Sequence, residues 1–337
     1  MKQINQFITE YIIKKKLETP INSEYNYHPQ TKEELIENIK ECFDIKIYNL
    51  NCIDTSKITD MSYIFKLIPE SHDINFDVSN WDVSNVEYMQ HMFYECIKFN
   101  CDLSDWNVSK VKNMDDMFCN CLDFEGNGLE NWDVSNVKLI NYAFNKCKNF
   151  NCNLSGWNVS NVRSMSSIFN GCINFEGKGL EKWNVSKVEN MDYMFKKCIK
   201  LNCDLSKWDV SKLKKAGRMF FECINFDCDL SDWNVSNITD MTYMFDSCTK
   251  FKGKGLENWD VSNVNKMVSL FANCENFDCD LSKWNVRKVE NMSGMFFYCT
   301  KFKGIGLEKW NVKRVKDMSF MFDECTSIKK LPTWYKK

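Results

Sequence analysis

The cysteines are the residues of this sequence whose type and spacing could do chemistry. The chain of 337 residues contains 18 of them. Thiolates bind zinc, form disulfides or act as nucleophiles, depending on what lies beside them. Ten cysteines recur at one place of a repeated motif, and five more follow a member of that set by five residues: Cys101, Cys152, Cys203, Cys228 and Cys279. In neighbouring repeats, Cys198, Cys203, Cys223 and Cys228 are therefore a candidate zinc site or candidate disulfide pairs.

Histidine gives little support to catalysis. The only three histidines, His28, His72 and His91, recur in no register of the repeat. A cysteine nucleophile needs an exposed thiolate with a histidine in reach, whereas a free cysteine on an apolar stripe behaves as a small hydrophobic residue. The pattern therefore favours packing for the cysteines. We predict no catalytic residues and no bound metal or cofactor.

A tryptophan marks each repeat, and the repeats must position every other residue. The Trp residues recur every 25 or 26 residues: Trp81, Trp106, Trp132, Trp157, Trp183, Trp208, Trp233, Trp259, Trp284 and Trp310. A fixed period of this length is typical of stacked supersecondary units. We number positions within a repeat from its Trp, so that position 12 is the twelfth residue after it. Position 12 is Phe and position 15 is Cys in all ten repeats, which defines a Trp column, a Phe column and a Cys column.

The positions that follow each Trp predict the local structure. Position 2 is always Val, and positions 5, 8, 12 and 15 are mostly apolar. That spacing is the i, i+3, i+7, i+10 stripe of an amphipathic helix, and a Ser at position 3, such as Ser84 or Ser109, is in place to cap it. The alternating Trp-Asx-Val indicates a short strand, with the Asx side chain in a turn. A strand, a cap, a short helix and a turn per repeat place the fold in the α/β class.

An extra residue distinguishes the 26-residue repeats. It comes with a Gly-x-Gly before the next Trp: Gly126 and Gly128, Gly177 and Gly179, Gly253 and Gly255, and Gly304 and Gly306. Glycine accepts positive φ readily, so the added residue can be looped out without moving the following Leu from the core. A phosphate cradle would need a long strand before it and a helix after it, whereas a strand is expected to follow here. We predict a structural turn.

The ends of the chain differ from the middle, as a stacked array requires. We divide the sequence into an N-terminal helical cap at residues 1–48, a degenerate first repeat and insertion at 49–80, regular repeats at 81–327 and a truncated last coil at 328–337. The cap is predicted to hold an outer helix carrying Ile4 and Phe7. A second helix is predicted in TKEELIENIKECF, where Thr31 and Glu34 form a capping box. Trp334 is expected to close the core at the other end.

Three stretches of the sequence resemble a known repeat. LSDWNVSKVKNMDDMF, LSDWNVSNITDMTYMF and IDTSKITDMSYIF, the last after a TKEEL helix, are similar to the 26-residue repeat of BspA-like bacterial surface proteins and lipoproteins, a relative of leucine-rich repeats. The resemblance covers about residues 30–332. It implies a right-handed β-α solenoid of leucine-rich-repeat-like coils, with a role in adhesion or protein binding at cell surfaces.

Net charge and hydropathy narrow the kinds of partner and the cellular compartment that we expect. The formal net charge is −2, and only four of the 44 basic residues are arginines. The bidentate fork of arginine is the usual tool for recognising phosphates and bases, so we predict no nucleic-acid partner. No run of apolar residues is long enough for a signal peptide or a membrane span. We expect an intracellular, cytoplasmic protein with reduced thiols and no membrane insertion, or one incorporated in a particle or surface structure.

The last two regular repeats differ from the others in charge. Their exposed turns carry Lys283, Arg287, Lys288, Lys309, Lys313 and Arg314. We name this set the basic strip. It is either a solvated, charged end of the array or a docking patch for an acidic protein partner. The leading hypothesis is a non-enzymatic repeat scaffold that binds another protein, or its own copies, through the strand-side face and the basic strip. The alternatives are a structural or adhesive component of a particle or cell surface, and a thiol-rich metal or redox protein.

Overall fold

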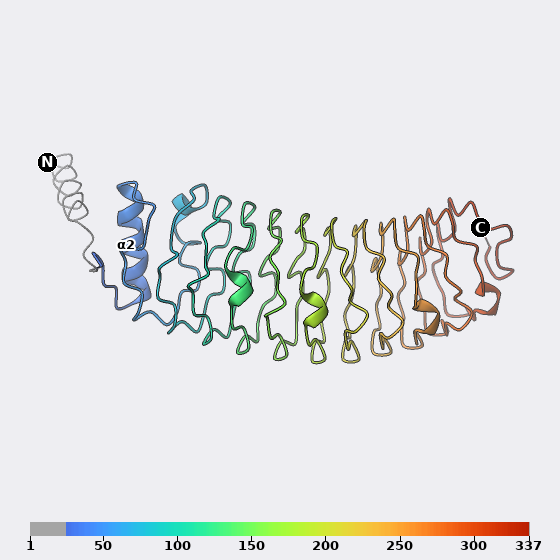
Figure 1. Cartoon of the computed structure of the whole chain (residues 1–337). Coiled ribbons are helices and arrows are strands. Elements are labelled where there is room, and N and C mark those ends of the chain that lie inside the picture. The colour runs from blue at the N-terminus through green and yellow to red at the C-terminus, as the bar shows by residue number, and fades with distance from the viewer. Residues whose placement is uncertain (1–24, 337) are drawn as a thin grey trace.

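The computed structural model describes residues 25–336, and these form one row of stacked coils (Figure 1). The row bends gently, and the described part begins and ends at opposite ends of it. One α-helix, α2 (Lys32–Asp44), stands beside the first coil. The other helices of the described residues are single 3₁₀ turns: η1 (Pro69–Ser71), η2 (Leu129–Asn131), η3 (Leu180–Lys182), η4 (Leu256–Asn258) and η5 (Leu307–Lys309). The outer helix expected around Ile4 and Phe7 lies outside the described residues.

The helix α2 begins at the cap that its sequence predicts. The Thr31 hydroxyl accepts the N–H of Glu34 at 3.2 Å, and the Glu34 carboxylate accepts the N–H of Gln30 at 2.6 Å. The reciprocal bond of the capping box therefore closes one residue further upstream than expected. On the inner face of the helix, Leu35 and Ile39 are fully buried. The helix thus covers the apolar N-terminal end of the core.

A ladder of parallel hydrogen bonds joins each coil to the next. Isolated parallel bridges recur at position 7, as between Tyr88 and Asn113. Beyond the bridge, the N–H groups at positions 8, 10, 12 and 14 of one coil donate to the carbonyls at positions 7, 9, 11 and 13 of the next. For one pair of coils, Met114, Asp116, Phe118 and Asn120 donate to Leu139, Asn141, Ala143 and Asn145 over 2.8 to 2.9 Å. The ladder satisfies buried backbone groups without a continuous strand.

The short helix predicted in each repeat is wrong. Positions 10 and 14 adopt positive φ, for example 56° at Asp116 and 65° at Asn120, which interrupts a right-handed helix. Every second N–H then closes a three-residue turn, as from Cys119 to the carbonyl of Asp116 at 3.1 Å. The remaining N–H groups point along the row to the next coil. The segment is therefore a series of turns, and the regularly spaced apolar residues are those on its buried side.

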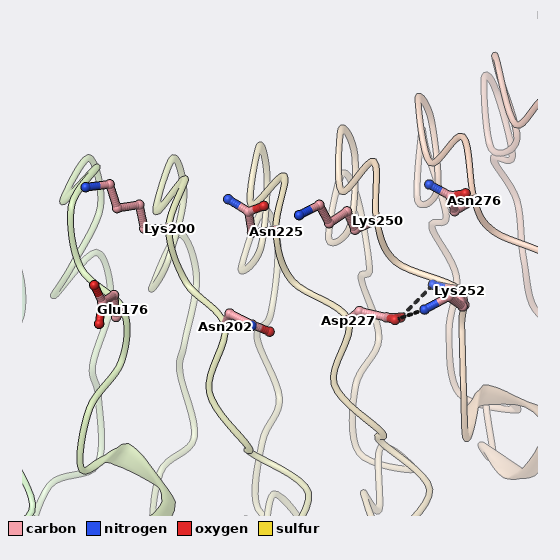
Figure 2. Close-up of a pocket in the computed structure, with 8 residues that line it drawn as sticks. All are labelled: Glu176, Lys200, Asn202, Asn225, Asp227, Lys250, Lys252 and Asn276. Atoms are coloured by element: carbon pink, nitrogen blue, oxygen red, sulfur yellow. Dashed lines mark hydrogen bonds and ion pairs between the residues drawn. The ribbon is translucent and has the colours of Figure 1, made fainter.

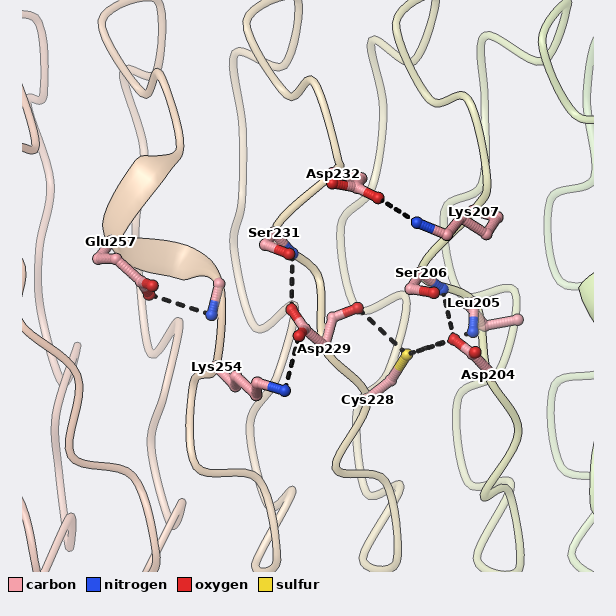
Figure 3. Close-up of polar contacts among 11 residues, drawn as sticks. Asp204, Leu205, Ser206, Lys207, Cys228, Asp229, Ser231, Asp232, Lys254 and Glu257 are labelled. Carbon is pink, nitrogen blue, oxygen red and sulfur yellow. Dashed lines mark hydrogen bonds and ion pairs between the residues drawn. The ribbon is translucent and has the colours of Figure 1, made fainter.

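The predicted Trp-Asx-Val strand and Ser cap are also wrong. No strand or bridge is assigned at these positions within the described residues. The Asx side chain accepts the N–H of the Ser two residues later, as between Asn107 and Ser109 at 3.1 Å, so the Asx turn is confirmed. Similar turns precede the Trp, where Asp204 and Asp229 accept from Ser206 and Ser231 at 2.9 and 3.0 Å (Figure 3). The handedness of the coils stays a prediction.

The core consists of aligned aromatic columns. The ten residues of the Trp column are at most 5% exposed, and those of the Phe column at most 6%. Successive indoles are nearly parallel, as for Trp132 and Trp157 with centroids 6.5 Å apart and planes 2° apart. Each indole N–H also donates to a Leu or Val carbonyl of an earlier coil, at 2.7 Å from Trp157 to Leu129. The Trp and Phe residues therefore point inward and lie in line from coil to coil.

The thiols of the Cys column donate hydrogen bonds as well as packing in the core. From Cys121 to Cys325, each thiol donates to the carbonyl of the Phe column residue in the preceding coil, over 2.9 to 3.1 Å. Cys96, the first member, lies 3.7 Å from the Ser71 hydroxyl instead. A small residue with a weak donor fits this buried place, because an unpaired carbonyl in the core is destabilising. Packing and this hydrogen bond together explain why the cysteine recurs.

Replacing Cys172 by alanine tests this role. The thiol is fully buried and donates to the Phe144 carbonyl at 3.0 Å. Its loss leaves a small cavity and removes a donor, so we expect the free energy of unfolding to fall by about 1–2 kcal/mol. Cys203→Ala, at a partly exposed thiol, should lower it less. Urea unfolding of both variants measures the difference, and equal losses would contradict a stabilising thiol ladder.

The Gly-x-Gly turns form as predicted, but a 3₁₀ turn follows them. Gly126 and Gly128 have φ of 92° and 89°, and Gly128 immediately precedes η2. The equivalent glycines precede η3, η4 and η5. The expectation that a strand follows is therefore wrong. A three-residue helix is too short to supply a phosphate site, so the turn remains structural.

Candidate functional site

The six residues of the basic strip are all exposed. Arg287 and Lys288 occupy one tight turn, and Lys313 and Arg314 occupy the matching turn of the next coil. The remaining two, Lys283 and Lys309, directly precede the buried Trp of the same two coils. Equivalent positions of bridged coils lie about 5 Å apart. The structure therefore places the strip along one end of the row.

Neighbouring polar groups hold part of the basic strip in place. The Lys283 ammonium donates to the Asn258 amide oxygen at 3.1 Å, and Lys288 donates to Asn263 at 2.7 Å. The hydrogen bonds from Ser282 lower the pKa of Asp280, with smaller contributions from Lys309 and Lys283. These bonds are exposed and leave most of the positive charge facing solvent.

Charge is segregated along the chain more strongly than the net value suggests. Residues 281–337 contain 13 Lys and Arg against 5 Asp and Glu, which gives a net charge of +8. Residues 1–280 contain the other 31 basic and 41 acidic residues, which gives −10. Surface charge of one sign attracts partners of the other sign over a distance of roughly 10 Å at physiological salt. The C-terminal end of the row is therefore positively charged, whereas the rest of the chain is negatively charged.

A second surface feature was missed by the sequence reasoning. Position 10 carries Tyr193, Arg218 and Tyr243 in three successive coils, with the guanidinium carbon 5.4 and 4.5 Å from the two ring centroids. Arg218 also donates to the Tyr193 hydroxyl at 3.0 Å. Lys196 lies over Tyr193 as well, at 5.6 Å. The recurrence of Tyr at position 10 could have revealed this column, but position 10 is not part of the apolar stripe on which the helix prediction was based.

A shallow hollow of about 670 Å³ crosses several coils, with side chains from two rows of positions around it (Figure 2). Its lining residues are all polar or charged: Glu176, Lys200, Asn202, Asn225, Asp227, Lys250, Lys252 and Asn276. Lys252 pairs with Asp227 within it. The lining offers ammonium, carboxylate and amide groups, which are suited to polar contacts.

Burial raises the pKa of the column thiols. Cys121 and Cys147 are fully buried, and their pKa values lie well above the ordinary value for that reason. Burial also raises the pKa of Cys152 to about 12 and that of Cys228 to about 11. Such thiols are protonated at neutral pH and are poor nucleophiles and ligands. The redox alternative finds little support in these groups.

Cys52 is expected to be the fastest of the described thiols to react with iodoacetamide. Its side chain is half-buried, and a hydrogen bond from the Cys42 thiol lowers the pKa of Cys52. A lowered pKa means more thiolate at pH 8, so alkylation should be at least about tenfold faster than at partly exposed Cys203, whose pKa burial raises to about 12. Peptide mass spectrometry over time measures both rates. Cys42→Ala should slow the reaction at Cys52, and equal rates at the two cysteines would disprove the assignment.

The candidate zinc cluster does not converge. The thiols of Cys198 and Cys223 donate to the carbonyls of Phe169 and Phe195, at 3.1 and 3.0 Å. Among residues 25–336, no three His, Cys, Asp or Glu side chains lie close enough together to share a metal ion. Cys228 lies near Cys203: burial is the main cause that raises the pKa of the Cys203 thiol, and the charge of Cys228 raises it further.

The fold and its repeat define a cysteine-rich tandem-repeat protein. The family model described as "Mycoplasma protein of unknown function, DUF285" matches residues 33–157, 138–254 and 240–336, which together span almost the whole described chain. The chain belongs to this family. No curated protein matches the sequence. In the part of the chain that the structure describes, no helix combines the length and the apolar character that crossing a bilayer requires.

Proposed function

We propose that this chain is a repeat scaffold that binds another protein and catalyses no reaction. The observation that carries the proposal is that the recurring Trp, Phe and Cys residues are buried and used in packing. The basic strip lies at the surface, and all six of its side chains are exposed. A surface of one sign favours partners of the other sign. The expected partner is an acidic protein surface rather than a nucleic acid.

We infer further that the coils wind right-handed, as in BspA-like leucine-rich relatives. The 25- or 26-residue period and the parallel bridges between successive coils support this reading. Stacked coils offer an extended surface on which neighbouring repeats act together. The Trp-Asx-Val side of the row consists of Asx turns. A partner that binds this side would therefore contact the side chains of those turns.

Reversing the charge of the strip tests the proposed surface. Partners are captured from native lysate on the wild-type protein and on the triple variant Lys283→Glu, Lys309→Glu, Lys313→Glu, and quantified by mass spectrometry. Each exposed rim charge contributes a modest amount, so three reversals should weaken an identified partner at least about tenfold. The loss should shrink at high salt, where the attraction is screened.

A matched control separates position from charge. The variant Lys138→Glu, Lys148→Glu, Lys212→Glu reverses three exposed lysines of interior coils and should keep the partner. Equal capture by all three proteins would remove the strip from the function. A loss with both variants would show that net charge, and not the C-terminal coils, governs binding.

The alternative is a structural or adhesive component of a particle or cell surface. The resemblance to BspA-like surface repeats and the length of the uninterrupted row favour it. Antibody labelling of intact cells, compared with lysed cells, distinguishes the two proposals. Labelling confined to lysed cells would leave the intracellular scaffold as the better account.

A further inference from the structure

Two thiols are neighbours where the alternation of repeat lengths breaks. Repeats of 25 and 26 residues alternate along the row, except that the repeats starting at Trp183 and Trp208 both have 25. Position 20 is cysteine in the shorter repeats and glycine in the longer ones. Cys203 and Cys228 are therefore the only cysteines that occupy this position in two successive regular repeats.

Position 20 brings the β-carbons of successive coils into contact. A Cβ built on Gly126 would lie 2.8 Å from the Cβ of Cys152, and one built on Gly177 would lie 3.0 Å from the Cβ of Cys203. Glycine in one of the two coils relieves this crowding. A pair of cysteines needs slightly more room, which brings the expected separation of their β-carbons close to the roughly 3.8 Å typical of a disulfide.

Hydrogen bonds hold the Cys228 thiol against the coil that contains Cys203. Its Sγ accepts the N–H of Leu205 at 3.2 Å and lies 3.7 Å from a carboxylate oxygen of Asp204 (Figure 3). Both contacts are within two residues of Cys203, whose own side chain is partly exposed. A hollow of about 510 Å³ is lined by both cysteines, so a small reagent in solution can reach the pair.

We propose that Cys203 and Cys228 are a modification site, at which a small disulfide such as glutathione disulfide oxidises the pair to a disulfide between successive coils. One protein thiolate attacks a sulfur of the reagent and displaces one glutathione thiolate. The second protein thiolate then attacks the protein sulfur of this mixed disulfide and displaces the other. Two electrons pass from the pair to the reagent, and the two thiol protons end on two molecules of glutathione.

The surroundings of the pair make this disulfide slow to form and hard to reduce. Burial raises the pKa of Cys203 to about 12 and that of Cys228 to about 11. Little thiolate is therefore present at neutral pH, and attack on the reagent is slow. For the same reason, each sulfur is a poor leaving group when another thiol attacks the finished disulfide.

The test incubates the full chain with excess glutathione disulfide at mildly alkaline pH and maps its peptides by mass spectrometry without reduction. We expect a linked pair of peptides containing Cys203 and Cys228, which lacks two hydrogen atoms relative to the free peptides. Backbone amides between the two cysteines should then exchange hydrogen at least about tenfold more slowly, because the link restricts the opened chain.

Cys203→Ser and Cys152→Ser are a matched pair of variants. Cys152 also occupies position 20, but its neighbours there are Gly126 and Gly177. Cys203→Ser should abolish the link and leave Cys228 free or joined to glutathione, with no slowing of exchange. Cys152→Ser should keep both the link and the slower exchange. Circular dichroism checks that both variants keep the fold.

Several outcomes would overturn the proposal. Separate glutathione adducts on Cys203 and Cys228, no reaction of either thiol, or a preferred link from either one to a different cysteine would each do so. A link that left amide exchange unchanged would show that the bond does not hold the two coils together. Partner capture through the basic strip is a separate property, so failure of either proposal leaves the other intact.

Discussion

Replacing Trp157 by alanine is expected to lower the free energy of unfolding by about 3–5 kcal/mol. The indole is 3% exposed and stacks between Trp132 and Trp183, with centroids 6.5 and 6.3 Å away. Its N–H donates to the Leu129 carbonyl at 2.7 Å. The substitution opens a cavity, removes two aromatic contacts and leaves a buried carbonyl short of one donor, and these effects act in the same direction.

Urea unfolding followed by circular dichroism measures the loss. Contacts in a stacked array are made only between neighbours, so weakening one interior coil should also broaden or split the transition. Trp334→Ala is the matched comparison, because Trp334 is only partly buried and stacks on a single indole. A loss at Trp334 as large as that at Trp157 would show that the column is not the main support of the interior coils.

The buried columns could be predicted from the sequence because burial leaves a direct trace in residue type. Trp at the start, Phe at position 12 and Cys at position 15 recur without exception, and all of them lie in the core. A side chain that must fill the same space in every coil tolerates few replacements. The resulting period also predicted stacking, since one repeat alone cannot bury these groups.

The backbone between the columns could not be predicted in the same way. An apolar residue every three or four positions satisfies a helix and equally a chain of turns with one buried side. The distinction depends on positive φ at positions 10 and 14, where most repeats carry residues with no preference for it, such as Tyr142 and Lys146. Gly171 and Gly294 occur at these positions and were the available signal. Bonds to the next coil outweigh the local preference.

One part of the candidate surface could likewise be predicted from the sequence, and another part could not. The basic strip was found because Arg287 and Lys313 replace a recurring Ser, and a departure from a repeat is visible in one sequence. The column of Tyr193, Arg218 and Tyr243 was not found, because only the arrangement in space places the Arg218 guanidinium against the two rings.

Replacing Gly179 by alanine is expected to lower the free energy of unfolding by about 3 kcal/mol. The residue has φ of 89°, a region that side chains other than glycine rarely adopt. A Cβ built there would lie 2.2 Å from the backbone nitrogen of Ser155 in the adjacent coil. Because the obstacle is backbone, the two coils must separate locally, which also disturbs the bond from Leu154 to the Lys178 carbonyl.

Gly171 separates backbone strain from steric conflict in the same experiment. It has φ of 79°, but its nearest neighbours to a new Cβ are atoms of Lys146 at 3.4 Å, an ordinary contact. Gly171→Ala should therefore lose only the roughly 1–2 kcal/mol of a left-handed residue, and Gly171→Asn less, since asparagine tolerates this conformation. Thermal or urea unfolding of the three variants ranks them. If Gly179→Ala were no worse than Gly171→Ala, the close approach of successive coils at the Gly-x-Gly turn would have no energetic weight, and the turn would serve only to accommodate the extra residue.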